Sequence, residues 1–483
     1  MDYFDHTWPD RAGYFKVEVR VLLTPGMKGV VVGCGKAGQS VVRFLLDRDI
    51  CVGVSEGRSA DQLDSDLVTD LQNKGVLFEW GGHTEAFLSS FDFVVPSPGI
   101  PLDLPVLNAV REKGVNIVGE LGLAAGHFQV PVIAVTGSNG KTTVTSLIGS
   151  LLAHAKREVF VGGNIGTPLL EYFAGSEQAR VVVLELSSFQ LDMVGAFRPD
   201  IGLILNISPD HLDRHHTVDA YVDAKFKLIR NQRLGDRLIL GGDDQRLAGI
   251  SSVNNVEVYR FGTGKQCEAV IKGDIIELSL QKKGVLSQET YDLKSTCLTS
   301  SVNRLNAAAA ILAARLAGCN KEQVQGGLNV FQPPLHRMTE VAVIDGVRYI
   351  NDSKATNYGA MHAALQGCAE PVVLIAGGRE KGGDWQQLRD VVVQKVRQLI
   401  LLGEAAGKMK QVFGDMVPVA MAESMDDAVQ VACRCAQDGD LVLLAPGCAS
   451  FDMYSGYEER GRVFMESVHR LRQEKEKRGL NDN

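Results

Sequence analysis

A glycine-rich segment that could cradle phosphate follows an apolar run in the second quarter of the chain. Residues 136–143 read TGSNGKTT, after the strand-like run VIAV and before a helical stretch. Glycines let backbone amides close around phosphate oxygens, lysine offsets their charge, and a threonine hydroxyl can hold Mg²⁺ at a helix N-terminus. The strict Walker spacing would need glycine at Val135, so this loop is a shortened form. We expect phosphate binding by its members, Gly137, Ser138, Asn139, Gly140, Lys141, Thr142 and Thr143.

A second glycine motif lies near the start of the chain. Gly33, Gly35 and Gly38 form a GxGxxG pattern directly after the apolar run VVV, and a second strand-like run ends at Glu56. This arrangement is typical of a dinucleotide site in which the acid binds a ribose. The same turn can hold the diphosphate of any nucleotide, or only allow close helix packing, so the motif alone leaves the ligand open.

Polar side chains stand at the ends of two later strand-like runs. Glu185 ends RVVVLE, and Asp210 with His211 follows IGLILNI. Ligands of parallel sheets bind at the carboxyl ends of the strands, and a carboxylate beside a phosphate loop can hold Mg²⁺. Lys225 follows on a predicted helix, where its spacing alone is that of a solvent-exposed lysine.

Three further polar loops follow strand-like runs near the C-terminus. The first is NDSKATN (351–357), preceded by Arg337, a residue type that binds phosphate or carboxylate in a bidentate manner. The others are GGREKGGD (377–384) and APGCASFD (445–452). Three such loops in one region predict a single ligand-facing edge.

The elements that must position these residues alternate along the chain. Apolar runs followed by helical stretches predict parallel sheets and an α/β protein. An Asp-Gly pair at 345–346 between two apolar runs predicts one antiparallel hairpin. We predict an N-terminal extension at 1–27, α/β domains at 28–119 and 120–333, and, after a Pro-Pro pair, a third α/β domain at 334–483.

Composition narrows the class of protein. The chain has 483 residues, enough for about three domains, and its net charge of −8 lacks the basic footprint of a nucleic-acid binder. No apolar run approaches the roughly 18 residues of a membrane span, and the N-terminus has no signal-peptide core, so we expect a cytoplasmic protein without membrane partners. The nine scattered cysteines predict reduced thiols rather than disulfides or zinc ligands.

Taken in order, these motifs resemble those of the Mur ligase family of ATP-dependent amide ligases. The resemblance covers about 28–462 and includes TGSNGKTT, NIGTP, LELSSFQL, NISPDHLDRH, YVDAK, PPLHRM, NDSKATN and GGREKGGDW. Within the family, LELSSFQL and SFDMYSGYEERG are most similar to the members that add D-glutamate to UDP-N-acetylmuramoyl-L-alanine. The DNPR-type motif of the diaminopimelate- and lysine-adding members is absent.

The resemblance implies an architecture and a reaction. A Rossmann-like domain would hold the UDP-sugar substrate, a central P-loop ATPase-type domain would hold ATP and two Mg²⁺ ions, and a C-terminal Rossmann-like α/β domain would bring in D-glutamate. ATP would activate the L-alanyl carboxylate as an acyl phosphate, which the D-glutamate amine attacks, in cytoplasmic synthesis of a peptidoglycan precursor. The glycine motif near the N-terminus would then hold UDP diphosphate, and we expect a monomer.

The resemblance also implies roles for single residues. The catalytic residues would be Lys141, His211 and Lys225, with Lys225 carbamylated. Outside the phosphate loop, ATP would meet Asn303, Arg337 and Asp352. The metal would be held by Thr142, Glu185, His211 and Lys225. The UDP-sugar would meet Ser55, Glu56, Arg58, Ser97, Gly99, Asn164 and His211. D-Glutamate would meet Lys354, Thr356, Lys381, Ser450 and Tyr457. Which group takes the proton of its amine, His211 or a nearby carboxylate, stays open.

Three other classes of protein compete with this interpretation. A nicotinamide oxidoreductase would use the GxGxxG motif but leave TGSNGKTT without a role. A nucleotide-binding switch would bind ATP without ligating anything. A sister ligase such as a folylpolyglutamate synthase shares the phosphate loop but lacks LELSSFQL.

Overall fold

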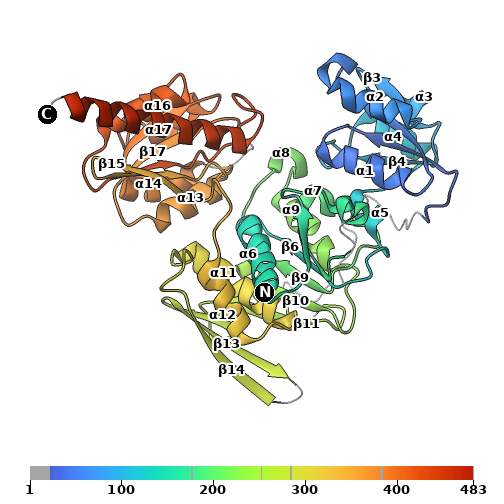
Figure 1. Cartoon of the computed structure of the whole chain (residues 1–483), viewed down its shortest axis with the longest axis horizontal. Coiled ribbons are helices and arrows are strands. Elements are labelled where there is room, and N and C mark those ends of the chain that lie inside the picture. Colours follow the sequence, from blue (N-terminus) through green and yellow to red (C-terminus); the bar gives the residue numbers. More distant parts are fainter. Residues whose placement is uncertain (1–21, 176–177, 252, 283–284, 381–384, 482–483) are drawn as a thin grey trace.

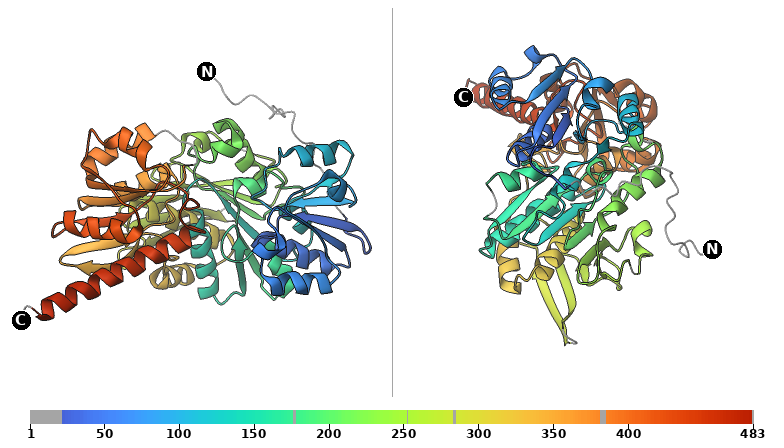
Figure 2. Two further views of the ribbon diagram at one scale, coloured as in Figure 1. Left: turned by 90° about the horizontal axis from the view of Figure 1, so that it is seen from above. Right: turned by 90° about the vertical axis from the view of Figure 1, so that its right-hand side faces the viewer.

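The computed structural model describes residues 22–175, 178–251, 253–282, 285–380 and 385–481. They form three α/β domains, each around its own sheet (Figure 1). Seen from above, the domains follow one another in a row, with the central domain between the other two (Figure 2). The predicted α/β class and three-domain architecture are confirmed, while the boundaries at 27/28, 119/120 and 333/334 stay predictions.

The N-terminal domain holds a five-stranded parallel sheet in the order β3-β2-β1-β4-β5. Its strands are β1 (Lys28–Val32), β2 (Cys51–Glu56), β3 (Leu77–Trp80), β4 (Phe93–Pro96) and β5 (Asn116–Ile117). Its helices are α1 (Lys36–Leu46), α2 (Ser65–Asn73), α3 (Glu85–Leu88) and α4 (Pro105–Glu112). The strand order reverses between β1 and β4, the point at which ligands bind in open α/β sheets.

The central domain holds a nine-stranded sheet in the order β14-β13-β12-β11-β10-β9-β6-β8-β7. Its strands are β6 (Val132–Thr136), β7 (Val159–Gly163), β8 (Val181–Glu185), β9 (Ile201–Ile204), β10 (Arg237–Gly241), β11 (Glu257–Gly262), β12 (Ala269–Lys272), β13 (Ile275–Lys282) and β14 (Val285–Asp292). The sheet is parallel from β7 to β12, and the antiparallel β13–β14 hairpin projects from the domain (Figure 1).

The central domain also contains helices, most of which lie between its strands in the sequence. They are α5 (Glu120–Ala124), α6 (Lys141–His154), α7 (Ser188–Leu191), α8 (Leu212–His215), α9 (Val218–Phe226), α10 (Gln245–Ala248), α11 (Ser301–Leu316) and α12 (Lys321–Val330). β6 and β8 are buried along their whole length. Such burial explains why the two strands are continuous apolar runs rather than alternating ones.

The C-terminal domain holds a six-stranded sheet in the order β15-β16-β20-β17-β18-β19. Its strands are β15 (Thr339–Ile344), β16 (Val347–Asn351), β17 (Val372–Gly377), β18 (Val396–Leu402), β19 (Val419–Met421) and β20 (Leu441–Leu444). Its helices are α13 (Tyr358–Gly367), α14 (Arg389–Lys395), α15 (Ala406–Phe413), α16 (Met425–Cys435) and α17 (Tyr457–Asn481). The predicted hairpin is confirmed, since β15 and β16 are antiparallel around Asp345 and Gly346, whose φ angles are 51° and 76°.

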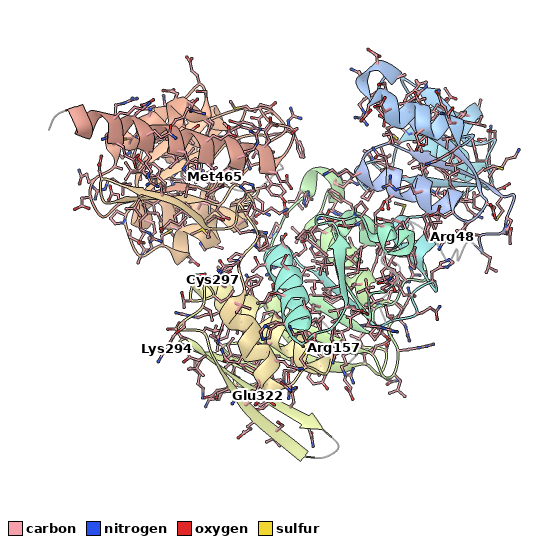
Figure 3. All side chains as sticks on the ribbon, in the orientation of Figure 1. Arg48, Arg157, Lys294, Cys297, Glu322 and Met465 are labelled. Atoms are coloured by element: carbon pink, nitrogen blue, oxygen red, sulfur yellow. The ribbon has the colours of Figure 1, made fainter. Side chains whose placement is uncertain are left out.

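The N-terminal domain packs against the central domain through the end of α1. The Arg48 guanidinium lies 3.6 Å from the centre of the Phe44 ring, which in turn lies 5.4 Å from the ring of Phe173 in the central domain. Arg43 of α1 forms an ion pair with Glu171. Figure 3 labels Arg48 at this junction. No helix among the described residues is long and apolar enough to cross a membrane.

Candidate active site

The TGSNGKTT loop joins β6 to α6 at the carboxyl edge of the central sheet. Gly137 and Gly140 have φ angles of 146° and 85°, a region that residues with a Cβ atom rarely adopt. A Cβ atom on Gly140 would also lie 2.4 Å from Asn306 Oδ1. The sequence therefore needs glycine at both positions, and the loop leads directly into the N-terminus of α6, an end of a helix that favours anions.

A second loop, 206–211 after β9, holds the phosphate loop in place. The Asn139 amide donates to Asn206 Oδ1 at 2.8 Å, and Asn206 Nδ2 donates back to the Asn139 carbonyl at 3.0 Å. Ser138 Oγ donates to the Ser208 carbonyl at 2.8 Å and lies 2.9 Å from the Tyr221 hydroxyl. The Ser138 side chain is thus committed to structure, and it leaves phosphate binding to the backbone.

Two lysines converge on the phosphate loop. Lys141 Nζ donates to the carbonyls of Gly137 and Ser138, both at 2.8 Å, and Lys225 Nζ donates to the Gly137 carbonyl at 2.8 Å. Lys225 is 1% exposed, so the solvent-exposed position that spacing alone suggests is wrong. Burial, and then the charge of Lys141, lower the pKa of Lys225 well below its usual value. Both influences favour the uncharged form of this amine more than solvent would.

Glu185 ends β8 with its carboxylate buried beside this lysine pair. Its side chain is 1% exposed, and Oε1 accepts from Asn164 Nδ2 at 2.8 Å. Oε2 is buried and has no hydrogen-bond donor among the described residues. A buried carboxylate oxygen without a partner is unfavourable unless a cation satisfies it. Asn164, the predicted contact of the sugar substrate, therefore also orients the predicted metal ligand.

The Glu185 oxygen that has no hydrogen-bond partner among the described residues fits a cation whose shell is completed by ligands from outside the protein. No group of three or more His, Cys, Asp or Glu side chains that could hold a metal is found in the described ranges. Mg²⁺ usually takes one or two carboxylates and completes its shell with phosphate oxygens and water. Glu185 and the buried Thr142 hydroxyl on the first turn of α6 would supply the few protein ligands that such a site needs.

His211 lies in the loop that braces the phosphate loop. Its φ angle is 54°, its amide donates to Asp210 Oδ1 at 2.9 Å, and its Nε2 lies 3.6 Å from Asp210 Oδ2. The ring lies 4.8 Å from the ring of Phe189, which belongs to the LELSSFQL segment. Nearby, His215 Nε2 lies 2.9 Å from Ser188 Oγ, so the two segments are joined at two points.

The C-terminal domain reaches the phosphate loop through the start of α13. Asn357 Nδ2 donates to Asp210 Oδ2 at 2.7 Å across the domain junction. A Cβ atom built on Gly359 would lie 3.2 Å from Asn139 Nδ2 and 3.3 Å from Ser208 Oγ. The two domains therefore meet at the loop predicted to hold the nucleotide.

Lys354 and Tyr457 face this junction from the C-terminal domain. Lys354 Nζ lies 3.6 Å from the centre of the Tyr457 ring. Burial lowers the pKa of Lys354 to about 8, with Glu185 opposing that shift and Lys141 adding to it. Burial also raises the pKa of Tyr457, and Glu185 contributes to that shift. The charge of Glu185, a residue of the central domain, therefore changes the pKa of both side chains.

The other predicted nucleotide contacts border the same junction. Asn303, on the first turn of α11, accepts from Asn306 Nδ2 at 3.2 Å, and Asn306 adjoins Gly140. Burial raises the pKa of Asp352 to about 6, against the opposing charge of Arg337. Arg337 Nε is buried without an acceptor in the part of the chain that the structure describes.

The described parts of the three C-terminal loops share one edge. The Thr356 amide donates to the Lys354 carbonyl at 2.8 Å, so both lie in one tight turn after β16. Arg379 and Ala449 exchange backbone hydrogen bonds of 2.9 Å, which joins the second loop to the third. Ser450 follows in the third loop and is 2% exposed. Lys381 lies outside the described residues.

The predicted UDP-sugar residues mainly hold the glycine turn of the N-terminal domain together. Glu56 Oε2 accepts from the Cys34 amide at 2.7 Å. Burial alone would raise the pKa of Glu56. Hydrogen bonds from Arg58 and from the Cys34 amide outweigh that effect and lower the pKa of Glu56 to about 2. Ser97 Oγ donates to the Gly33 carbonyl at 2.9 Å.

Ser55 and Gly99 differ in exposure within this region. Ser55 is fully buried, and its hydroxyl donates to Glu79 Oε2 at 2.7 Å and lies 2.7 Å from His83 Nδ1. Gly99 is exposed in the loop after β4, which packs on Gly33 through Ser97 and Ile100. Gly99 and the backbone of the glycine turn are therefore better placed for ligand contact than the Ser55 side chain.

Family models match each of the three domains. The Mur ligase MurD-like N-terminal domain matches 27–119, the Mur ligase middle domain matches 135–314, and the Mur ligase glutamate ligase domain matches 336–448.

Curated relatives match nearly the whole chain. The UDP-N-acetylmuramoylalanine–D-glutamate ligase of Desulfotalea psychrophila is 42% identical over 441 residues, 91% of this chain and 95% of that protein. The ligase of the same name from Desulfatibacillum aliphaticivorans is 40% identical over 446 residues, 92% and 99% of the two chains. The chain belongs to the Mur ligase family.

A solved structure shows the same Mur ligase fold at low identity. The MurF ligase of Thermotoga maritima, in complex with ADP, is 15% identical with a TM-score of 0.57 and covers 94% of this chain and 98% of its own. At 15% identity, the similarity between the two structures is evidence for a shared fold alone.

Several polar residues of this Mur ligase site were not singled out from the sequence. Asn206 and Ser208 lie inside NISPDH, of which only Asp210 and His211 were named as candidate site residues. Asn357 ends NDSKATN, and Tyr221 opens the YVDAK segment. Their positions inside the motifs could have indicated a role in the site. Their contacts could not be predicted, because each contact joins segments that are far apart in sequence.

Proposed function

We propose that this Mur ligase joins D-glutamate to UDP-N-acetylmuramoyl-L-alanine with consumption of ATP, a step of peptidoglycan precursor synthesis. The observation that carries the proposal is that relatives named for this activity match at about 40% identity over more than nine tenths of the chain. The site geometry supports it, because Asn357 joins the C-terminal domain to the loop that holds the phosphate loop, and the charge of Glu185 acts on both Lys354 and Tyr457.

The chemistry requires activation of a carboxylate. A carboxylate and an amine do not condense in water, so the γ-phosphoryl group of ATP passes to the L-alanyl carboxylate. The amine of D-glutamate then attacks the acyl phosphate, and the tetrahedral intermediate expels phosphate. The protein contributes chiefly charge neutralisation and positioning. Lys141 and the amides at the start of α6 are the groups that would perform the first of these tasks.

For the metal we propose that Thr142, Glu185, His211 and a carbamylated Lys225 hold Mg²⁺ at two sites. The fit rests on the unsatisfied Glu185 Oε2 and on the depressed pKa of Lys225, since only a neutral amine captures CO₂. When bound, Mg²⁺ offsets phosphate charge and orients the phosphoryl group. Asn164 keeps Glu185 in position, and Asp210 holds the backbone at His211.

For ATP we propose contacts from the phosphate loop together with Asn303, Arg337 and Asp352. Asn303 is supported by its bond to Asn306, which touches Gly140. The buried Arg337 Nε without an acceptor among the described residues supports a role for that guanidinium in anion binding.

For the amino acid we propose that Lys354, Thr356, Lys381, Ser450 and Tyr457 receive D-glutamate. Lysines at two places suit an acceptor with two carboxylates. The shared edge of the first and third loops supports the grouping. Lys381 enters this proposal from the family resemblance alone.

For the UDP-sugar we propose the glycine turn of β1 with Ser55, Glu56, Arg58, Ser97 and Gly99, and Asn164 for the muramoyl part. In this proposal Ser55 and Glu56 act mainly by fixing the loops. We also propose a monomer, because the candidate residues converge within one chain. A cytoplasmic location follows from the use of ATP and a nucleotide sugar.

The direct test is phosphate release from ATP with a panel of UDP-muramoyl substrates and D- and L-amino acids. We expect release only when UDP-N-acetylmuramoyl-L-alanine and D-glutamate are both present. Omission of either substrate is the control. Release that requires another amino acid would assign the chain to a different Mur ligase activity, and nucleotide binding without release would make it a switch.

A further inference from the structure

An arginine is buried beneath the loops proposed to receive the amino acid. Arg460 lies on the first turn of α17, the helix on which Figure 3 labels Met465, and it is 3% exposed. Burial lowers the pKa of Arg460 to about 10. In the described ranges its guanidinium forms no ion pair with a carboxylate. A buried cation without a paired acid is unfavourable unless its N–H groups are satisfied otherwise.

Oxygens of two loops satisfy this guanidinium. Nε donates to Ser353 Oγ at 3.0 Å, and Nη2 donates to the Ser353 carbonyl at 2.8 Å. Nη1 donates to the carbonyls of Cys448 and Ala449 at 3.1 and 3.3 Å. One side chain thus joins the loop after β16 to the loop after β20.

The third loop is joined to the same point. The Arg379 amide and carbonyl pair with Ala449, whose carbonyl also accepts from Arg460. A Cβ atom on Gly378 would lie 3.2 Å from Arg460 Nη1. The three loops therefore meet around one guanidinium.

Two of the residues proposed to contact D-glutamate are direct neighbours of these attachment points. Lys354 follows Ser353, and Ser450 follows Ala449. The Ser353 hydroxyl donates to the Tyr457 carbonyl at 2.9 Å, which ties the loop to the start of α17 as well. A shift of any one attachment point would change the spacing between the groups on different loops.

We infer that Arg460 is a positioning residue that sets the spacing of the D-glutamate loops without touching the substrate. This inference rests on the function proposed above. The planar fork of arginine carries N–H donors in fixed directions, which four acceptors on two loops can use together. A lysine has a single nitrogen on a flexible stem and cannot reproduce that geometry.

The test compares Arg460→Lys with Arg462→Lys in the full chain. Arg462 lies on the same helix, is exposed and pairs with Glu466, so its replacement controls for a change on α17. For Arg460→Lys we expect the KM for D-glutamate to rise about tenfold or more, equal to about 1.4 kcal/mol. The KM values for ATP and for the UDP-sugar should stay within about twofold of wild type, as all three should in Arg462→Lys.

Chemical rescue separates a positioning role from a general loss of structure. In Arg460→Ala, methylguanidinium below denaturing concentration should lower the KM for D-glutamate, and it should have no effect on Arg462→Ala. If the Arg460 variants do not fold, Ser353→Ala removes one acceptor and should show the same selective rise in that KM. An unchanged KM for D-glutamate in a folded variant, or an equal rise in all three KM values, would overturn the inference.

This outcome is distinct from failure of the proposed function. The amino acid that supports phosphate release in the wild-type enzyme decides the function. The change in the KM of that amino acid relative to ATP, measured on the variants, decides the role of Arg460.

Discussion

The amines of Lys141 and Lys225 donate to the same oxygen, the carbonyl of Gly137, each at 2.8 Å. Burial of Lys225, and then the charge of Lys141 beside it, lower the pKa of Lys225. Their shared partner places the proposed phosphate-binding cation and the proposed carbamate at one peptide group. The first two predictions below follow from this arrangement.

Replacement of Lys225 by alanine should abolish ligation and should be partly reversed by short-chain carboxylic acids. The acid would restore the oxygens that a carbamate supplies, whereas a lysine that acts as a simple cation would not be replaced by an anion. The measurement is phosphate release with and without added acid. Lys141→Ala, assayed with the same acids, is the control and should show no recovery. Full activity of Lys225→Ala would end the carbamate hypothesis.

Lys141→Ala should lower turnover by roughly a hundredfold or more while the chain stays folded. The ammonium offsets charge that develops on the transferred phosphoryl group, and loss of one such group typically has an effect of this size. Turnover and the unfolding temperature should be measured together, with the exposed Lys410→Ala as the matched control. Near-normal turnover in Lys141→Ala would contradict the assignment of this loop.

The contact between Asn357 and Asp210 should matter for activity rather than for stability. Asn357 also caps α13 by accepting from the Ala360 amide at 2.8 Å, and Asn357→Asp keeps that oxygen while it replaces the donor to Asp210 by a like-charged carboxylate oxygen. We expect about a fivefold or larger loss of kcat with little change in unfolding temperature, because a hydrogen bond contributes about 1 kcal/mol. Asn320→Asp, at the exposed cap of α12, is the control and should be neutral. A loss of stability with unchanged kcat would assign Asn357 to capping alone.

Glu120 should make stability depend on pH. It is buried where the chain enters the central domain and accepts from Gln190 Nε2 at 3.3 Å. Burial raises the pKa of Glu120 from 4.5 to about 7, since the hydrogen bonds it accepts only partly oppose the shift. The folded state thus binds this proton more tightly than the unfolded state. Its contribution to stability is fully present below about pH 4.5 and is lost as the pH rises through 7.

Replacement of Glu120 by glutamine should remove the loss of stability that Glu120 causes as the pH rises through 7. A shift of this size corresponds to roughly 3 kcal/mol, so the variant should be more stable than wild type at pH 8 and similar to it near pH 5. Urea unfolding midpoints across this range make the comparison, and Glu112→Gln at the exposed end of α4 is the control. Parallel pH profiles for Glu120→Gln and wild type would refute the linkage.

Local patterns predicted the phosphate loop and the buried strands well, because both depend on neighbouring residues. The glycines of TGSNGKTT stand where the φ angles are positive, and β6 and β8 are buried throughout. The strands β11 to β14 were not predicted. Their residues are largely half-exposed and mix polar with apolar side chains, so no continuous apolar run marks them.

Long-range contacts set the limits of prediction at the site. Helical spacing indicated an exposed Lys225, but packing of α9 against the phosphate loop buries it. Ser55 is predicted to meet the UDP-sugar, and the structure adds that its hydroxyl is bonded to Glu79 and lies beside His83, from the next strand and its loop. Arg460 belongs to the SFDMYSGYEERG motif, but the motif does not indicate its contacts, since its four acceptors lie on loops that meet only in the folded domain.

The most direct test of the account is the mass of the product formed from UDP-N-acetylmuramoyl-L-alanine, ATP and glutamate. With D-glutamate we predict a product heavier by one glutamyl residue, formed in equal amount to the phosphate released. With L-glutamate the rate should be at least about a hundredfold lower, because inversion at the α-carbon leaves the amine misplaced or a carboxylate unpaired, and about 3 kcal/mol suffices for that ratio. Equal use of both enantiomers, or phosphate release without a glutamyl product, would contradict the account.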